Sequence, residues 1–66
     1  MAHIYAILTD SGSMDDFEAE NIADALDQFD APRSVRSVAA FEAWLERVGG
    51  YGWIEQDGVL IAEVKS

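Results

Sequence analysis

The chain has 66 residues, enough for one domain spanning 1–66, and its 13 Asp and Glu outweigh four Lys and Arg to give a formal net charge of −9. This charge argues against nucleic acid and anionic membranes as partners, because phosphate binding requires many Lys and Arg. Half of the residues are hydrophobic, which excludes a disordered acidic tail, and the absence of cysteine excludes disulfides and thiolate metal sites.

The first half of the chain predicts two strands and a helix. Residues 3–9 are rich in Ile, Tyr and Leu and predict a strand, and residues 10–13 have turn chemistry. Over residues 15–20, Phe17 and Ala19 alternate with acids, which predicts a half-buried strand with an acidic outer face. A helix should follow, capped by Asn21 and carrying one apolar stripe. That stripe consists of Ile22, Ala25, Leu26 and Phe29.

The middle of the chain predicts a break and then a second helix. Pro32 disfavours helix in the residue before it, so the first helix should end ahead of it. Ser34 or Ser37 can cap the second helix, and the two consecutive glycines after residue 48 supply its C-terminal stop. Trp44 lies beside the predicted buried stripe, which consists of Val38, Phe41, Leu45 and Val48.

The last part of the chain predicts a β-hairpin. Residues 51–56 and 59–64 are rich in β-formers and are joined by Asp57-Gly58, the signal for a two-residue type I′ turn. That turn predicts one face with Tyr51, Trp53, Leu60, Ala62 and Val64, and another with Ile54, Val59 and Ile61. The element order is then ββααββ and the fold class is α+β. The economical architecture is a four-stranded, mainly antiparallel sheet with both helices packed on one face.

The excess charge is concentrated in the first half of the chain. Residues 1–32 carry eight acids and no Lys or Arg, whereas residues 33–66 carry five acids and four bases, so the local net charges are −8 and −1. Carboxylates that alternate along a strand repeat about every 6.5 Å, and those three apart on a helix lie about 5–6 Å apart. Rows at such intervals imitate DNA phosphates. We therefore assign partner binding to Asp15, Asp16, Glu18, Glu20, Asp24, Asp27 and Asp30.

A second interpretation is that these acids only solvate a small domain. These acids lower the stability of the fold, because like charges at helical spacing destabilise a helix. This loss of stability favours a functional role for them. Asp27 and Asp30 also lie near the predicted helix C-terminus, where the helix dipole disfavours anions. Both interpretations stay open on the residues alone.

Catalytic and metal sites are not expected. The only histidine, His3, lies at the start of a strand and is a surface or edge residue rather than a general base. Without cysteine, the usual nucleophile–base pairs are nearly missing. The segment 10–15 places Gly12 and Met14 where a calcium loop needs oxygen ligands. We therefore expect no enzymatic activity, no cofactor and no metal.

Some apolar surface should remain exposed. A sheet with helices on one side leaves its other face bare, and the first strand is apolar on both faces. Tyr51 and Trp53 are candidates for that bare face. It would serve a partner or self-association, so the protein is expected to be a monomer or a weak homodimer.

The acidic hairpin 15–20 (Asp-Asp-Phe-Glu-Ala-Glu), the acidic helix 21–30 and the small size resemble the phage-encoded anti-CRISPR proteins, especially acidic α/β inhibitors of type I systems that are similar to DNA mimics. The resemblance implies that surface acids contact basic residues of the crRNA-guided surveillance complex (Cascade). The contact would lie at its large DNA-binding subunit and would block target DNA. The nearly neutral second half departs from that class, so the mimicry would be one-sided.

Two other functions fit the same residues. An antitoxin or immunity protein that blocks a basic toxin would use the same acids, whereas a self-associating structural or accessory protein would use the bare sheet face. The apolar run 4–8 is short, lacks a basic flank and is followed by Asp10, so neither a signal peptide nor a membrane span is expected. The expected location is the cytoplasm, of a bacterial host cell if the protein is phage-encoded.

Overall fold

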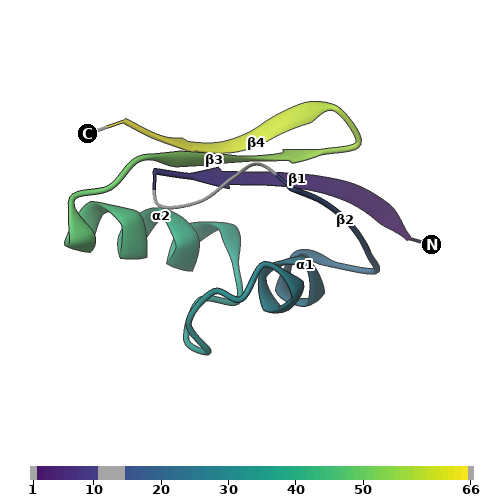
Figure 1. Ribbon diagram of the computed structural model, residues 1–66, viewed down its shortest axis with the longest axis horizontal. Helices are drawn as coiled ribbons and strands as arrows, with labels where there is room; N and C mark the ends of the chain where they lie inside the picture. The colour runs from purple at the N-terminus through teal and green to yellow at the C-terminus, as the bar shows by residue number, and fades with distance from the viewer. Residues whose placement is uncertain (1, 11–14, 66) are drawn as a thin grey trace.

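The computed structural model describes residues 2–10 and 15–65, which form one four-stranded antiparallel sheet with two helices on one of its faces (Figure 1). In chain order the elements are β1 (His3–Thr9), β2 (Asp15–Ala19), α1 (Ile22–Gln28), α2 (Val38–Val48), β3 (Gly52–Gln56) and β4 (Val59–Val64). The strand order is β2-β1-β3-β4, so β1 and β3 are central. The ββααββ order and the α+β class are confirmed. The turn expected at 10–13 lies outside the described residues apart from Asp10.

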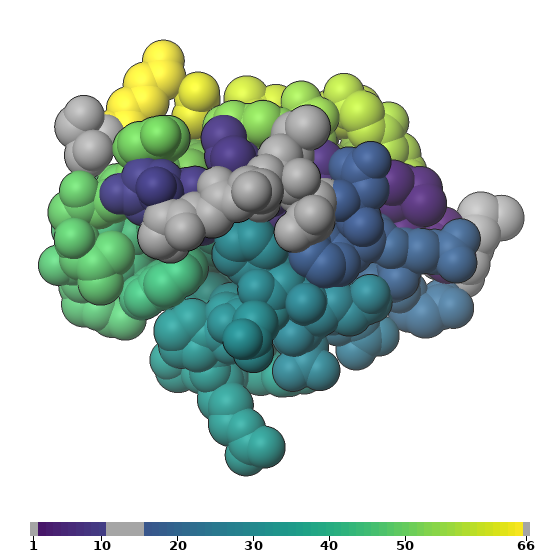
Figure 2. Space-filling model, in the orientation of Figure 1, coloured from purple at the N-terminus to yellow at the C-terminus, as the bar shows by residue number. Residues whose placement is uncertain are grey.

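Local signals set the helix boundaries. The Asn21 side chain accepts a hydrogen bond from the Asp24 N–H at 2.9 Å, and the Ser37 side chain accepts one from the Ala40 N–H at 3.1 Å. Ser37 is therefore the cap of α2. This helix ends at Gly49, whose φ of 70° is a left-handed conformation that glycine adopts without a Cβ penalty. The connection between the helices projects from the side of the molecule opposite the sheet (Figure 2).

The core lies between the helices and the sheet. Its largest fully buried side chains are Phe41, Ile7, Leu26, Leu45 and Ile54. The other stripe residues Ile22, Phe29 and Val38 are partly exposed and pack against this core. Val48 is 63% exposed, so its expected burial is wrong. Val48 is the last residue of α2, and this end of the helix reaches past the ends of the strands (Figure 1).

A β-bulge interrupts the hairpin of β3 and β4. The two turn residues have positive φ (52° and 84°), as the type I′ signal predicts. The pair Glu55–Leu60 also follows the expected register. The next pair is Ile54–Ala62, so Ile61 is an extra residue on β4 and the register shifts by one.

The bulge decides which side chains of β4 face the helices. Ala62 and Val64 join Ile54 in the core, whereas Trp53 pairs with Glu63 on the opposite face. The prediction that Trp53 shares a face with Ala62 and Val64 is therefore wrong. Without the extra residue, Ala62 and Val64 would turn away from the helices and Glu63 would turn toward them. The bulge thus avoids the burial of a carboxylate in the core.

Asp57 ties the hairpin turn to the start of β1. Its carboxylate accepts a hydrogen bond from the Ile4 N–H at 2.8 Å and pairs with His3 Nδ1 at 2.8 Å. Its own N–H donates to the Ile4 carbonyl oxygen at 2.7 Å. The bond from Ile4, and then that from His3, hold the pKa of the Asp57 carboxyl below its usual value. Burial raises the pKa of the Tyr5 phenol, and the charge of Asp57 adds to this effect.

The lowered pKa of Asp57 predicts that the protein loses stability as the pH falls into the acidic range. Because the folded-state pKa lies below the unfolded value of about 3.9, this stabilising effect is present above about pH 4 and is lost as the pH falls through the folded-state pKa. Asp57→Asn, which retains a residue that tolerates positive φ, should therefore lose less unfolding free energy than the wild type between about pH 5 and about pH 2. Urea unfolding followed by circular dichroism measures both profiles. If the unfolding free energies of the two proteins fell in parallel with pH, the Asp57 carboxylate would make no such contribution to stability.

Candidate functional site

The acids on β2 lie at one edge of the sheet. Phe17 and Ala19 face the helices, and the Phe17 ring meets that of Phe29 edge-on at 6.0 Å between centroids. Asp16 and Glu18 are exposed on the opposite face, as the alternation predicts. Asp15 is the first residue of this strand and belongs to its backbone ladder with β1. The acidic outer face of β2 is therefore confirmed for the exposed pair.

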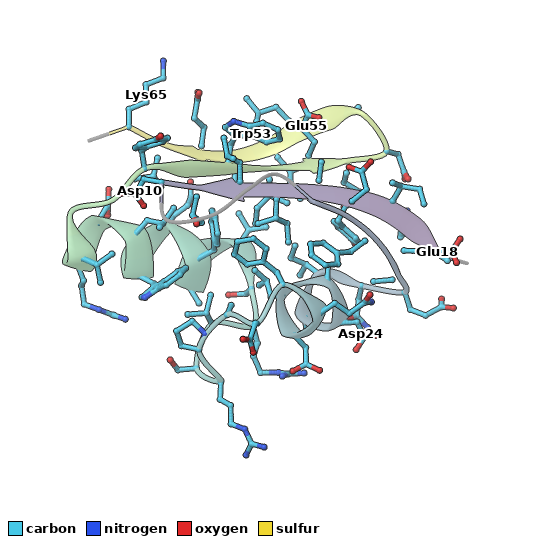
Figure 3. All side chains as sticks on the ribbon, viewed as in Figure 1. Asp10, Glu18, Asp24, Trp53, Glu55 and Lys65 are labelled. Atoms are coloured by element: carbon cyan, nitrogen blue, oxygen red, sulfur yellow. The ribbon has the colours of Figure 1, made fainter. Side chains whose placement is uncertain are left out.

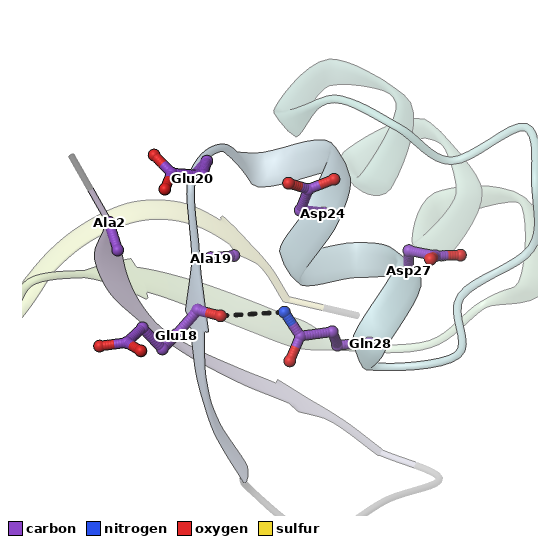
Figure 4. Close-up of a pocket in the computed structure, with 7 residues that line it drawn as sticks. All are labelled: Ala2, Glu18, Ala19, Glu20, Asp24, Asp27 and Gln28. Atoms are coloured by element: carbon purple, nitrogen blue, oxygen red, sulfur yellow. Dashed lines mark hydrogen bonds between the residues drawn. The ribbon is translucent and has the colours of Figure 1, made fainter.

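The acids on α1 form a second group on the helix side of β2. Asp24 and Asp27 are exposed, and Glu20 lies between the strand and the helix. An open depression of about 360 Å³ separates β2 from α1 (Figure 4). The Gln28 side chain crosses it and donates to the Glu18 carbonyl oxygen at 3.0 Å, while the Glu18 carboxylate points away from the helix (Figure 4). The depression is lined by Ala2, Glu18, Ala19, Glu20, Asp24, Asp27 and Gln28.

The exposed acids of this region are called the acidic surface and are Asp16, Glu18, Glu20, Asp24, Asp27 and Asp30. The ion pairs found in residues 2–10 and 15–65 are those of Asp57 with His3 and of Glu63 with Lys65, at 2.8 and 3.9 Å. They leave most of the acidic surface without a basic partner in this part of the chain. The members concerned are Asp16, Glu18, Asp24, Asp27 and Asp30.

Asp30 ends α1 in a conformation that costs free energy. Its φ is 70°, the same as that of Gly49 at the end of α2. The Asp30 N–H donates to the Asp27 carbonyl and the Ala31 N–H to the Leu26 carbonyl, both at 3.0 Å, which closes the helix in a Schellman motif. A left-handed residue with a Cβ costs about 1–2 kcal/mol. The carboxylate also lies at the negative end of a helix whose last turn holds no base.

Replacement of Asp30 by glycine should therefore stabilise the protein. We expect Asp30→Gly to raise the unfolding free energy by about 1 kcal/mol, because it removes both the Cβ strain and the unfavourable charge. Gly49→Asp is the matched control at the other helix end and should lower the unfolding free energy by about the same amount. Chemical denaturation measures both. A destabilising Asp30→Gly would show that the carboxylate forms a compensating contact.

Trp53 lies between carboxylates on the face of the sheet opposite the helices. Its cross-strand neighbours are Leu8 and Glu63. Glu55 lies two residues along β3, and both it and Trp53 rise on the side away from the helices (Figure 3). The sequence predicts a bare face with Trp53 but not the adjacent Glu63. The bulge that places Glu63 there leaves no signal in the hydrophobic alternation.

Comparison of the chain with protein-family models, curated proteins and solved structures gives no match. Within residues 2–10 and 15–65, no helix has the length and apolar character needed to cross a bilayer. The same part of the chain groups no three His, Asp or Glu side chains so that they could hold a metal ion.

Proposed function

We propose that this protein is a non-catalytic inhibitor whose acidic surface binds a basic, nucleic-acid-binding surface of another protein. The observation that carries this proposal is that most of the acidic surface is exposed and has no basic partner among the described residues. Some of these acids also occupy costly positions. Asp24 and Asp27 repel each other at helical spacing, and Asp30 is strained at the negative end of α1. Acids that serve only solubility have no need of such positions.

The physical basis is competition for a row of cationic side chains. A protein that grips DNA displays Lys and Arg that respond to negative charge, which carboxylates share with phosphates. Alternate residues of β2 lie about 6.5 Å apart, and residues three apart on α1 lie about 5–6 Å apart. The depression between β2 and α1, bordered by Glu20, Asp24 and Asp27, offers a place for an entering basic side chain. Complementary potentials also accelerate the encounter.

The partner that we propose is the large DNA-binding subunit of a type I CRISPR surveillance complex, which the resemblance to acidic anti-CRISPR proteins implies. The protein would then act in the cytoplasm of a bacterial host. Inhibition requires only that the acidic surface occupy the basic stripe on which target DNA lies. It requires no bond to be made or broken.

Displacement of target DNA tests this function. The protein is added to a purified surveillance complex that carries fluorescent target duplex, and the anisotropy should fall to that of free DNA. The Kd of the protein for the complex, measured without DNA, should rise at least about tenfold between about 0.1 M and about 1 M salt, because the Debye length falls from about 10 Å to about 3 Å. Failure to displace DNA, or a Kd that does not respond to salt, would contradict the proposal.

A further inference from the structure

The face of the sheet opposite the helices, here called the open face, has an apolar row along its central strand β1. The apolar side chains of this face come from β1, β3 and β4 and are Ile4, Ala6, Leu8, Trp53 and Leu60. Ile4 is 47% exposed and Leu60 is 51% exposed. Neighbouring apolar side chains that remain this accessible are typical of a surface that another molecule covers.

Carboxylates lie on both sides of this apolar row. Asp16 and Glu18 lie along β2 on one side, and Glu63 lies on β4 on the other. Trp53 has Glu63 directly across from it and Glu55 two residues along β3, about 6.5 Å away. A cation above an indole ring is attracted by the ring itself, and the adjacent carboxylates add to this attraction. Glu55 pairs with Ala6 on one side and with Leu60 on the other, so it separates Leu60 from the apolar row that Ile4, Ala6 and Leu8 form along β1. That row therefore suits apolar groups, and the carboxylates on both sides of it suit bases.

We propose that the open face binds an amphipathic basic helix of a partner protein. The apolar stripe of that helix would lie along β1 on Ile4, Ala6 and Leu8, with Arg or Lys on both flanks and one arginine stacked on Trp53. Charge complementarity selects this occupant, because acids at both borders of the face match bases on both flanks of the helix. The inference goes beyond the proposed function, which requires only the charges of the acidic surface.

The surroundings of the open face support this occupant over a second copy of the chain. A second copy would bring the same carboxylates to the same borders and would add another net charge of −9. Among the described residues, Glu63 pairs only with an exposed Lys65, at 3.9 Å. An exposed pair of this kind is weak, so an incoming guanidinium can replace it.

A labelled helical peptide tests the proposal directly. The probe is about 20 residues long, with leucines on one helical stripe and arginines on both flanks, and its Kd is measured by anisotropy. Leu60→Glu and Ile4→Glu change half-exposed side chains, so the fold should be kept, and each should raise the Kd at least about tenfold. Val48→Glu is the matched control: Val48 is 63% exposed on α2, away from the open face, and this change should leave the Kd as it is.

Fluorescence locates the peptide on the protein. The chain has two tryptophans, so Trp44→Phe leaves Trp53 as the only tryptophan, and its selectively excited emission should shift to the blue when the peptide covers it. Equal binding of a peptide with the same residues in scrambled order, or full binding by both Leu60→Glu and Ile4→Glu, would overturn the proposal. So would a dimer that Leu60→Glu dissociates in sedimentation. The peptide test uses neither DNA nor variants of α1. A negative result would therefore concern the open face alone and would leave the proposed function to be judged by the displacement of DNA.

Discussion

A double variant in which Asp24 and Asp27 become lysine is expected to lose at least about 100-fold in affinity for the basic partner. Both carboxylates are exposed on α1 and border the depression beside β2. Each reversal replaces an attraction by a repulsion, and like charges brought together in an interface cost several kcal/mol. About 2.8 kcal/mol corresponds to a factor of about 100 in Kd. Calorimetric titration into the purified surveillance complex measures the loss.

The fold of this double variant should be kept. Asp24 lies in the first turn of α1, where the helix dipole favours an acid, and Asp27 lies in the last turn, where it favours a base. The two changes in dipole energy therefore oppose each other. The matched control replaces Glu42 and Glu46 of α2 by lysine, which changes the net charge equally, from −9 to −5, and should largely keep the affinity. Equal losses of affinity from both double variants would show that the acidic surface is not the binding site and that its acids serve only solubility.

Replacement of Gly52 by alanine is expected to remove a third or more of the unfolding free energy of the domain. Gly52 is buried at the start of β3 and pairs with Thr9 on one side and Val64 on the other. A Cβ at this position would overlap the carbonyl oxygen of Leu8 and would lie 2.9 Å from Leu45 Cδ1. Because a backbone oxygen cannot rotate away, β1 and β3 must move apart.

We expect this separation to cost about 3 kcal/mol, at the upper end of overpacking effects. A domain of 66 residues has a total unfolding free energy of about 3–10 kcal/mol. Gly50→Ala is the control, because its Cβ would meet the exposed carboxylate of Asp10, 2.9 Å away, which can rotate aside. It should cost less than about 1 kcal/mol. Urea denaturation compares the two variants, and equal midpoints would show that the central strands tolerate the wider spacing.

The elements of this fold could be predicted because their signals are local. Asn21 and Ser37 cap helices through bonds to residues three positions away, and the turn at 57–58 needs only its own two residues. The bulge at Ile61 could not be predicted in this way. It is set by the packing of Ala62 against the helices, a tertiary contact that neither strand alternation nor the turn specifies.

The candidate site could be predicted in part for the same reason. Alternation along β2 identifies the exposed pair Asp16 and Glu18, and helical spacing identifies Asp24 and Asp27. The two pairs lie on different sides of β2. This arrangement depends on where α1 packs, which no local sequence pattern specifies. The pairing of His3 with Asp57 likewise joins residues at opposite ends of the sequence, and only the order of the strands brings them together.

The central strands β1 and β3 pair two segments that lie far apart in the sequence. Thr9 pairs with Gly52, so the ladder closes a loop of 43 positions, at an entropic cost of about 3.3 kcal/mol beyond a constant. Neither two-stranded hairpin is stable alone in water. A nascent chain therefore cannot begin to form this central ladder until β3, which begins at residue 52, has emerged from the ribosome. A premature stop before that position would yield an unfolded peptide that proteases degrade, with no half-sized fragment left to compete for the partner.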